Sequence, residues 1–432
     1  MPRRASHSPL TIFINGKPVG VLRREPSGAI DFTYDRTWLE WPAALPISLS
    51  LPLREDRYVG APVAAVIDNM LPDGDAIRRQ IAGRVKAEGA DAFSLLSAIG
   101  RDCVGAMQFL PGDEAPGSPG VIEAVPASDA DVAGILADLA HAPLGMTEDG
   151  AFRLSLAGAQ EKTALLYRDG GWWVPTGSTP TTHILKPAIG IVGDGVDFSD
   201  SVDNEYLCMR LTAAFGLPTA RVQRAEFAGH PVLVVERFDR RWTPDARLLR
   251  LPQEDFCQAT STPSALKYES DGGPGLVRLL RLLGGADDPA SDQRALLKAN
   301  IVFWLLGATD GHAKNFSVFL RPGGRFGLTP LYDVLSAQRV VDAGQLRQNR
   351  FRLSMALGRN RHYAIDAIQP RHFVETAKLA SIGASIVESV LAELVDEVPD
   401  ALDRTLATLP AGFPEALAAA IRTGVLRRLP KN

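Results

Sequence analysis

The stretch that decides the fold is GATDGHAKNFS at residues 307–317, followed a short way on by LYD at 331–333. The residues before it, 299–306, are almost wholly apolar, which predicts a buried helix that ends in a polar loop. After the loop, 316–320 has the composition of a β-strand, and the RPGG turn that follows predicts a hairpin whose return leads to Asp333. The sequence therefore predicts a helix, a loop and a hairpin that gather polar side chains in one cleft.

Three polar side chains of this stretch have the spacing of a phosphoryl-transfer site. Asp310 and Asn315 stand in the D-x-x-x-x-N pattern of protein kinase catalytic loops, and Asp333 follows where those enzymes place a magnesium-binding acid. One carboxylate, Asp310, would accept the hydroxyl proton, while Asn315 and Asp333 would hold Mg²⁺ on the triphosphate of ATP. Asp and Asn also commonly cap helices and close turns. The helix and hairpin around them favour the kinase interpretation.

Residues that could hold the phosphates of ATP occur upstream. The segment SLAGAQEK at 155–162 contains small residues, which let backbone N–H groups approach phosphate oxygens, although an ordinary turn has the same composition. Lys186 ends an apolar strand in HILKP and suits a phosphate-binding ammonium; a salt-bridged strand-end lysine is the alternative. The loop residues expected to contact nucleotide are Ala157, Gly158, Ala159, Gln160, Glu161 and Lys162.

A second set of residues is expected around the adenine and the catalytic loop. An apolar strand turns polar at Glu236, Arg237 and Phe238, whose backbone would pair with the purine edge. His312 and Lys314 lie inside the catalytic loop and are expected to contact nucleotide, with a hydrogen-bonded structural histidine as the alternative for His312.

Two further features lie outside these motifs. Glu205, in a predicted helix at 204–215, either pairs with Lys186 or is a solvated glutamate on the helix surface. The loop at 267–274 either lies beside the substrate cleft or is a plain surface loop.

These blocks together resemble the HipA family of bacterial serine/threonine kinases, the toxins of HipBA toxin–antitoxin modules. Nearly the whole chain is covered, in the family's order. The match assigns no role to Gln253, Glu254 and Asp255. The similar blocks are SLAGAQEK, HILKP at 183–187, VERFD at 235–239, LPQED at 251–255, TDGHAKN at 309–315, PLYD at 330–333 and, nearer the amino terminus, FINGKPVG at 13–20, ISLSLPL at 47–53 and DNMLPDG at 68–74.

The resemblance implies a fold, an activity and partners. The fold would be α+β and two-lobed, protein-kinase-like of the HipA type, with an amino-terminal β-rich subdomain and an all-helical carboxy-terminal lobe. The activity would be transfer of the ATP γ-phosphate, with Mg²⁺, to Ser or Thr of a protein such as an aminoacyl-tRNA synthetase, which arrests growth. A HipB-like helix-turn-helix antitoxin would carry the complex to operator DNA. Ser155 would be autophosphorylated, which ejects the nucleotide loop and silences the kinase; otherwise it only satisfies a local hydrogen bond.

The chain divides into three regions on composition. We expect an amino-terminal subdomain at 1–110, a nucleotide-binding lobe at 121–238 and a helical catalytic lobe at 239–432, with a Pro/Gly-rich linker between the first two. Asn15-Gly16 predicts a hairpin turn in the first region. Further helices are expected at about 75–86, 377–394 and 413–429.

Composition bounds the remaining possibilities. The 432-residue chain has a net charge of −4 and a pI of about 6.0, so DNA contacts would fall mainly to a partner. Its three cysteines are widely spaced, which predicts buried reduced thiols rather than a zinc site or disulfides. No apolar run approaches the ~18 residues of a membrane span, so we expect a cytoplasmic protein. A small-molecule or lipid kinase and a non-catalytic corepressor stay open as alternatives.

Overall fold

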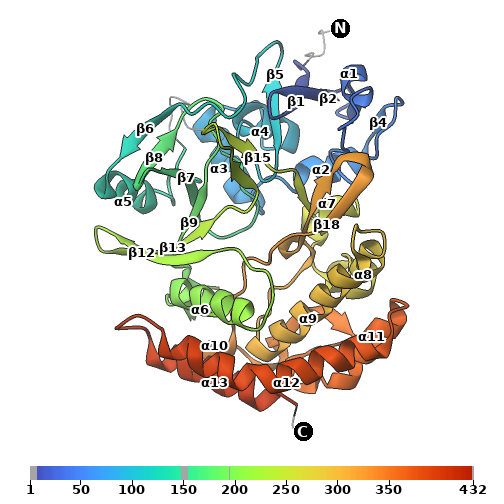
Figure 1. The fold of residues 1–432 in the computed structure, drawn as a ribbon. Coiled ribbons are helices and arrows are strands. Elements are labelled where there is room, and N and C mark those ends of the chain that lie inside the picture. The colour runs from blue at the N-terminus through green and yellow to red at the C-terminus, as the bar shows by residue number, and fades with distance from the viewer. Residues whose placement is uncertain (1–6, 147–153, 194, 431–432) are drawn as a thin grey trace.

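The amino-terminal part of the chain is built on an antiparallel five-stranded sheet. The computed structural model describes residues 7–146, 154–193 and 195–430, and the strand order of this first sheet is β4-β3-β2-β1-β5 (Figure 1). Asn15 and Gly16 both adopt positive φ between β1 and β2, so the predicted hairpin turn is confirmed. The elements of this amino-terminal region (residues 7–111) are β1 (Leu10–Ile14), β2 (Lys17–Arg24), β3 (Ile30–Tyr34), α1 (Arg36–Leu39), β4 (Tyr58–Val59), α2 (Ala61–Asp68), α3 (Asp75–Val85), α4 (Ala92–Ile99) and β5 (Met107–Pro111).

A six-stranded sheet in the order β12-β13-β9-β7-β8-β6 lies along one side of the molecule, on the left in Figure 1. Strand β9 carries Lys186 and is paired antiparallel with β13 and β7. Helix α6 packs on β12 and β13, and it ends before Gly216, where the sequence predicted a stop. The elements are β6 (Ala124–Ala127), α5 (Asp129–Ala137), β7 (Thr163–Arg168), β8 (Gly171–Pro175), β9 (His183–Pro187), β10 (Gly190–Val192), β11 (Val196–Phe198), α6 (Ser201–Ala214), β12 (Val222–Phe227) and β13 (His230–Glu236).

The carboxy-terminal lobe is dominated by helices, and α10, α11, α12 and α13 form a layer at the opposite end from the first sheet (Figure 1). Its central helix α9 is buried over most of its length, as its apolar sequence predicted. The expected helical stretch 377–394 is divided between α11 and α12, because the chain turns at Ser381, which has a positive φ. The principal helices are α7 (Phe256–Ala259), α8 (Leu276–Leu283), α9 (Pro289–Leu306), α10 (Gln338–Asp342), α11 (Pro370–Leu379), α12 (Ala384–Ala407) and α13 (Glu415–Arg428).

The α+β, two-lobed fold class is confirmed, but the carboxy-terminal lobe is not all-helical. The hairpin predicted after the catalytic loop is present and gains a third strand from residues 253–255, because their backbone pairs with the first hairpin strand. Two further strand pairs lie in the same lobe. The strands are β14 (Arg240–Trp242), β15 (Leu248–Arg250), β16 (Gln253–Asp255), β17 (Ser317–Arg321), β18 (Arg325–Leu328), β19 (Arg352–Leu357) and β20 (His362–Ala364).

Two expectations from composition can be compared with this fold. Cys103, Cys208 and Cys257 are all buried and free, so the prediction of reduced core thiols is confirmed. Over the described ranges, no helix combines the length and the apolar character that crossing a bilayer requires.

Candidate active site

The catalytic loop leaves the buried helix α9 at Gly307, whose positive φ ends the helix. The Asp310 side chain is 55% exposed, so its carboxylate faces the open side of the loop. The buried Asn315 donates from Nδ2 to the Asp310 carbonyl oxygen at 2.7 Å, which leaves the amide oxygen of Asn315 free of that bond. A side chain at Gly311 would meet the ring of Phe303 at 2.5 Å, so the loop requires glycine there. These contacts favour the observed conformation of the loop.

Lys186 joins two acids that come from different parts of the chain. Its Nζ donates to Glu205 Oε1 on α6 at 2.7 Å and to Asp333 Oδ1 at 2.6 Å. Burial alone would lower the pKa of Lys186, but the charges of Asp333 and Glu205 outweigh it and raise that pKa above its ordinary value. Although burial opposes it, the positive charge of Lys186 holds the pKa of Asp333 well below its usual range. Glu205 is therefore the partner of Lys186 and not a solvated surface glutamate.

Asp333 itself stands in the left-handed region, with a φ of 61°. Asp tolerates this conformation better than most residues, yet it stays unfavourable and recurs at functional sites. The side chain is 39% exposed, so one carboxylate oxygen is bound by Lys186 while the group still reaches solvent.

The segment 155–162 folds back on itself beside Lys186. Lys162 Nζ donates to the Ala157 carbonyl at 2.6 Å, and Gln160 Nε2 donates to the Pro187 carbonyl at 3.0 Å, at the end of β9. Gly158 has a φ of 103°, which favours glycine. Burial, and then the positive charge of Lys186, lower the pKa of Lys162 to about 8. Ala159 and Glu161 are exposed. The ammonium groups of Lys162 and Lys186 thus lie within electrostatic reach of each other and of the nearby carboxylates, which are Asp333, Asp73 and Glu205.

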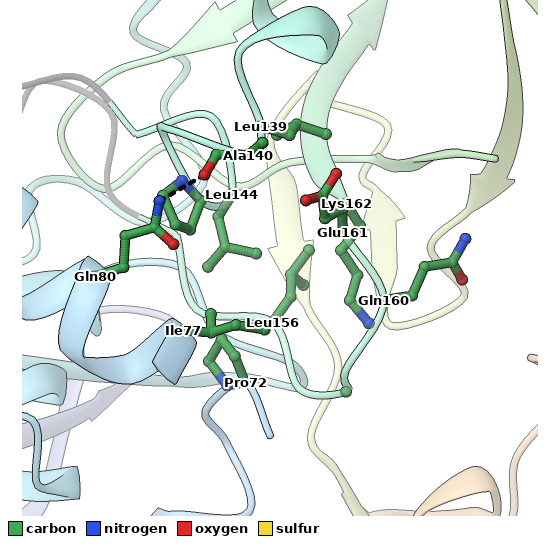
Figure 2. A pocket seen from close by; sticks show the side chains of 12 residues that line it. Pro72, Ile77, Gln80, Leu139, Ala140, Leu144, Leu156, Gln160, Glu161 and Lys162 are labelled. Carbon is green, nitrogen blue, oxygen red and sulfur yellow. Dashed lines mark hydrogen bonds between the residues drawn. The ribbon is translucent and has the colours of Figure 1, made fainter. Parts of the chain in front are cut away.

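A small pocket lies on the side of this segment that faces the amino-terminal region (Figure 2). Figure 2 shows Gln160, Glu161 and Lys162 on one wall, with Leu156 between them and helix α3 opposite. Lys186, Asp310 and Asp333 do not line this pocket. The walls are Pro72, Ile77, Gln80, Leu139, Ala140, Pro143, Leu144, Leu156, Gly158, Gln160, Glu161 and Lys162.

The expected adenine-binding backbone is partly engaged within the protein. The N–H of Glu236 donates to the Arg221 carbonyl, and that of Arg237 donates to the Thr182 carbonyl, each at 2.9 Å. The guanidinium of Arg237 is buried in an ionic cluster rather than directed at a ligand (the cluster comprises Asp102, Arg237, Asp239, Arg240 and Arg250). The ring of Phe238 packs against Phe319 and Tyr332. Contact of this segment with the purine stays a prediction.

The two other expected nucleotide contacts differ in their surroundings. His312 is buried, and its Nε2 lies 3.8 Å from Asp310 Oδ1. Burial lowers its pKa below the ordinary value, which favours the neutral ring, and among described residues Nδ1 has no hydrogen-bond partner. The ammonium of Lys314 is bound by Asp73 of the amino-terminal region at 2.8 Å. His312 is therefore near the catalytic carboxylate, while Lys314 is paired with an acid that sequence reasoning did not single out.

Tyr268 is a second residue that sequence reasoning missed. Its hydroxyl donates to Asp310 Oδ1 at 2.8 Å, and its ring packs edge-to-face on His312. The loop 267–274 therefore lies against the catalytic loop. No spacing in the sequence signalled this contact, because residues 268 and 310 belong to separate segments.

Ser155 is fully buried at the start of the phosphate-binding segment. Its Oγ donates to the Met70 carbonyl at 2.8 Å, and its N–H donates to the Asp102 carbonyl at 2.9 Å. Both acceptors belong to the amino-terminal region. The serine therefore anchors this segment to that region.

Residues 253–255, which had no assigned role, connect the two parts of the protein. Glu254 is fully buried and accepts from the Leu49 N–H at 2.7 Å, and burial raises its pKa to about 8. Asp255 caps α7 by accepting from the Gln258 N–H at 2.8 Å, and burial raises its pKa to about 7. Both residues thus have structural contacts.

The donor set suits a magnesium ion that takes most of its ligands from phosphate and water. Within the described residues, no group of three or more His, Cys, Asp or Glu side chains could hold a metal by itself. Mg²⁺ in phosphoryl-transfer sites uses one or two protein carboxylates or amides besides the substrate. The free oxygens of Asn315 and Asp333 fit that requirement.

A carboxylate on a loop after a buried helix, an adjacent amide, and a lysine bridging a helix acid and a second carboxylate define the kinase-like class of folds. The chain belongs to the HipA family. Residues 10–110 match the HipA N-terminal domain, and residues 154–402 match the HipA-like C-terminal domain.

Known proteins are similar to this chain over nearly its full length, both in sequence and in structure. The chain is 35% identical over 402 residues to Y4mE of Sinorhizobium fredii, named as a kinase candidate, covering 92% of this chain and 91% of that protein. It is 27% identical over 390 residues to the serine/threonine-protein kinase toxin HipA of Shewanella oneidensis, covering 87% and 84%. A solved Shewanella oneidensis complex of HipA, HipB and operator DNA matches with a TM-score of 0.81 at 25% identity, covering 97% of this chain and 96% of that one.

Proposed function

We propose that this protein is a HipA-type serine/threonine kinase that transfers the γ-phosphate of ATP to a protein hydroxyl. The observation that carries the proposal is the contact of Lys186 with both Glu205 and Asp333. The contact supports the proposal because it joins the cation expected to bind phosphate to the acid expected to bind the metal, although 147 positions separate them in sequence.

The residues of the site have complementary tasks in this reaction. Asp310 accepts the proton of the acceptor hydroxyl, because its carboxylate is exposed and held on a fixed loop. Lys186 and Lys162 attract the phosphates and reduce the repulsion that an incoming nucleophile meets. Asn315 and Asp333 would hold Mg²⁺, which when bound neutralises charge on the triphosphate. The loop 157–162, the backbone at 236–238, His312 and Lys314 complete the proposed nucleotide contacts, and the ion pair with Asp73 would hold Lys314 in place for its contact.

We extend the proposal to regulation and partners by analogy with the family. Phosphorylation of Ser155 would introduce about two negative charges into a fully buried position, which is incompatible with the observed segment and would displace it. A HipB-like antitoxin would restrain the toxin and bind operator DNA, as in the Shewanella oneidensis complex of HipA, HipB and DNA. A translation component, such as an aminoacyl-tRNA synthetase, is the proposed substrate class, and its modification would arrest growth.

The direct test compares the wild-type protein with Asp310→Asn. Each is incubated with labelled ATP and cell extract, and Asp396→Asn, an exposed position on α12, is the matched control. We expect labelled protein bands with the wild type and the control and none with Asp310→Asn, although that variant still binds ATP. Label found only in small molecules would indicate a different acceptor. Growth arrest that persists in Asp310→Asn would contradict an enzymatic toxin.

A further inference from the structure

One short segment of the amino-terminal region, residues 70–73, lies against the phosphate-binding segment. The Met70 carbonyl accepts from Ser155 Oγ at 2.8 Å. Pro72 and Gly158 form an isolated parallel bridge, and the Asp73 N–H donates to the Gly158 carbonyl at 3.0 Å. Residues 70–73 thus hold the phosphate-binding segment both at its start, Ser155, and at its middle, Gly158.

The carboxylate of Asp73 binds the opposite side of the site. Its Oδ1 accepts from Lys314 Nζ and its Oδ2 from Lys267 Nζ, each at 2.8 Å. Lys314 belongs to the catalytic loop, between Asp310 and Asn315, and Lys267 precedes Tyr268, whose hydroxyl contacts Asp310. One residue therefore connects the phosphate-binding segment through its backbone and the catalytic loop through its side chain.

The two ion pairs are strong enough to fix the position of Asp73. The Lys314 side chain is only 3% exposed, and Lys267 and Asp73 are largely buried, so solvent screens the pairs weakly. Although burial opposes ionisation, Lys314 and Lys267 lower the pKa of Asp73 to about 2, and it stays charged at neutral pH. Besides these two lysines, further titratable groups lie within electrostatic reach of Asp73, among them Lys162, Asp255, Tyr268 and His312.

The contact with Gly158 has a geometric consequence for ligand binding. A trans peptide is planar, and its C=O and N–H point in opposite directions. Because the Gly158 carbonyl is turned towards Asp73, the N–H of Ala159 points away from the amino-terminal region. Phosphate binding requires several backbone N–H groups that point towards the phosphate.

We propose that Asp73 is a positioning residue: it couples the closed phosphate-binding segment to the assembled catalytic loop. This inference rests on the proposed kinase function, because one of its tests measures the binding of ATP. It deepens that function, because it makes an amino-terminal residue part of the nucleotide site. Loss of the carboxylate would leave Lys314 and Lys267 without their anion, and it would remove the side-chain anchor of the segment whose Asp73 N–H holds the Gly158 carbonyl.

The test uses the full chain with Asp73→Asn, and Asp75→Asn as the matched control, since Asp75 is exposed two residues away at the start of α3. Hydrogen exchange of peptides covering 70–76 and 155–162 is measured without nucleotide, and the Kd for Mg²⁺–ATP is measured separately. We expect about tenfold faster exchange in both peptides and about tenfold weaker ATP binding, from the loss of charge-assisted hydrogen bonds. Asp75→Asn should match the wild type.

Two additional variants separate positioning from general instability. Lys267→Met removes one pair only and should give a smaller increase in exchange, whereas Asp73→Glu keeps the charge and should recover part of the ATP affinity. If Asp73→Asn does not fold, Lys267→Met alone decides. Exchange in 155–162 that equals the wild type in every folded variant would overturn the inference. A wild-type protein that binds no ATP would instead remove the proposed function, while the exchange data would still decide the role of Asp73.

Discussion

Replacing Lys186 by Met tests whether the ion-paired lysine serves the chemistry, the stability or both. The substitution leaves Glu205 buried without its cation, and breaking a buried pair in this way costs about 3–5 kcal/mol. Asp333 adds little to this cost, because its side chain is 39% exposed and can be solvated. Burial already raises the pKa of Glu205, and loss of Lys186 would raise it further. A carboxyl group whose pKa is raised in the folded state makes the protein less stable as pH rises. The destabilisation caused by Lys186→Met should therefore be larger at pH 8.5 than at pH 6.

The assay combines thermal unfolding with phosphoryl transfer. Lys186→Met should lower the Tm by several degrees and lower the transfer rate by at least about a hundredfold, since a preorganised charge on the phosphates is lost. In Lys186→Met/Glu205→Leu, the unpaired acid is gone, so most of the stability should return while activity stays low. Lys298→Met is the matched control, because Lys298 is a buried lysine on α9 paired with Glu393, away from the phosphate-binding segment.

The two readouts separate the possible results. Lys298→Met should lose stability and keep its activity per folded molecule. If Lys186→Met retains activity near that of the wild type, the lysine is a structural ion-pair residue and the assigned phosphate role is wrong. If the double variant is as unstable as Lys186→Met, the unpaired Glu205 is not the source of the cost.

Three further predictions concern single residues. Ser155→Asp should weaken ATP binding at least about tenfold, because it puts a charge into a fully buried position, while Ser155→Ala should lose only one hydrogen bond; equal Kd values for ATP would contradict this. Tyr268→Phe should lower the KM for the protein acceptor severalfold, because the phenol hydroxyl no longer occupies Asp310 Oδ1; an unchanged KM would argue against that competition. Glu254→Gln should become progressively more stable than the wild type as pH rises from 5 to 8, by up to about 4 kcal/mol, because burial raises the pKa of Glu254 to about 8; parallel Tm–pH curves would refute it.

The parts of the site that could be predicted are those encoded in short segments. Asp310 and Asn315 lie five residues apart on one loop, and the flanking helix and hairpin have clear local signatures. The strand of Lys186 could be recognised in the same way, from its apolar run and its terminal charge. Local backbone preferences determine these elements, so a single sequence is enough to recognise them.

The contacts that sequence reasoning missed join residues far apart in the chain. Asp73 and Lys314 are 241 positions apart, and Tyr268 and Asp310 are 42 apart. A salt bridge of this kind imposes no periodicity on either segment, so although Asp73 lies in the family-like block at 68–74, its pairing with Lys314 has no signature in the sequence. For Arg237 the strand was located as expected, but which way the side chain points depends on Asp102, 135 positions away. The direction of such a side chain becomes visible only in the tertiary structure, which brings both partners together.

The amino-terminal region supplies ion-pair or hydrogen-bond partners at three places in and around the candidate active site. Asp102 supplies one of the two acids that neutralise three buried arginines beside β13, and Leu49 supplies the N–H that Glu254 accepts. Asp73 pairs with the catalytic-loop lysine, Lys314. Removing the region would take Asp102 from the buried arginines, Asp73 from Lys314 and the Leu49 N–H from Glu254. Loss of the partner of a buried charge costs several kcal/mol, comparable to the whole stability of a typical domain. We therefore predict that the two matched parts of the chain fold as one cooperative unit.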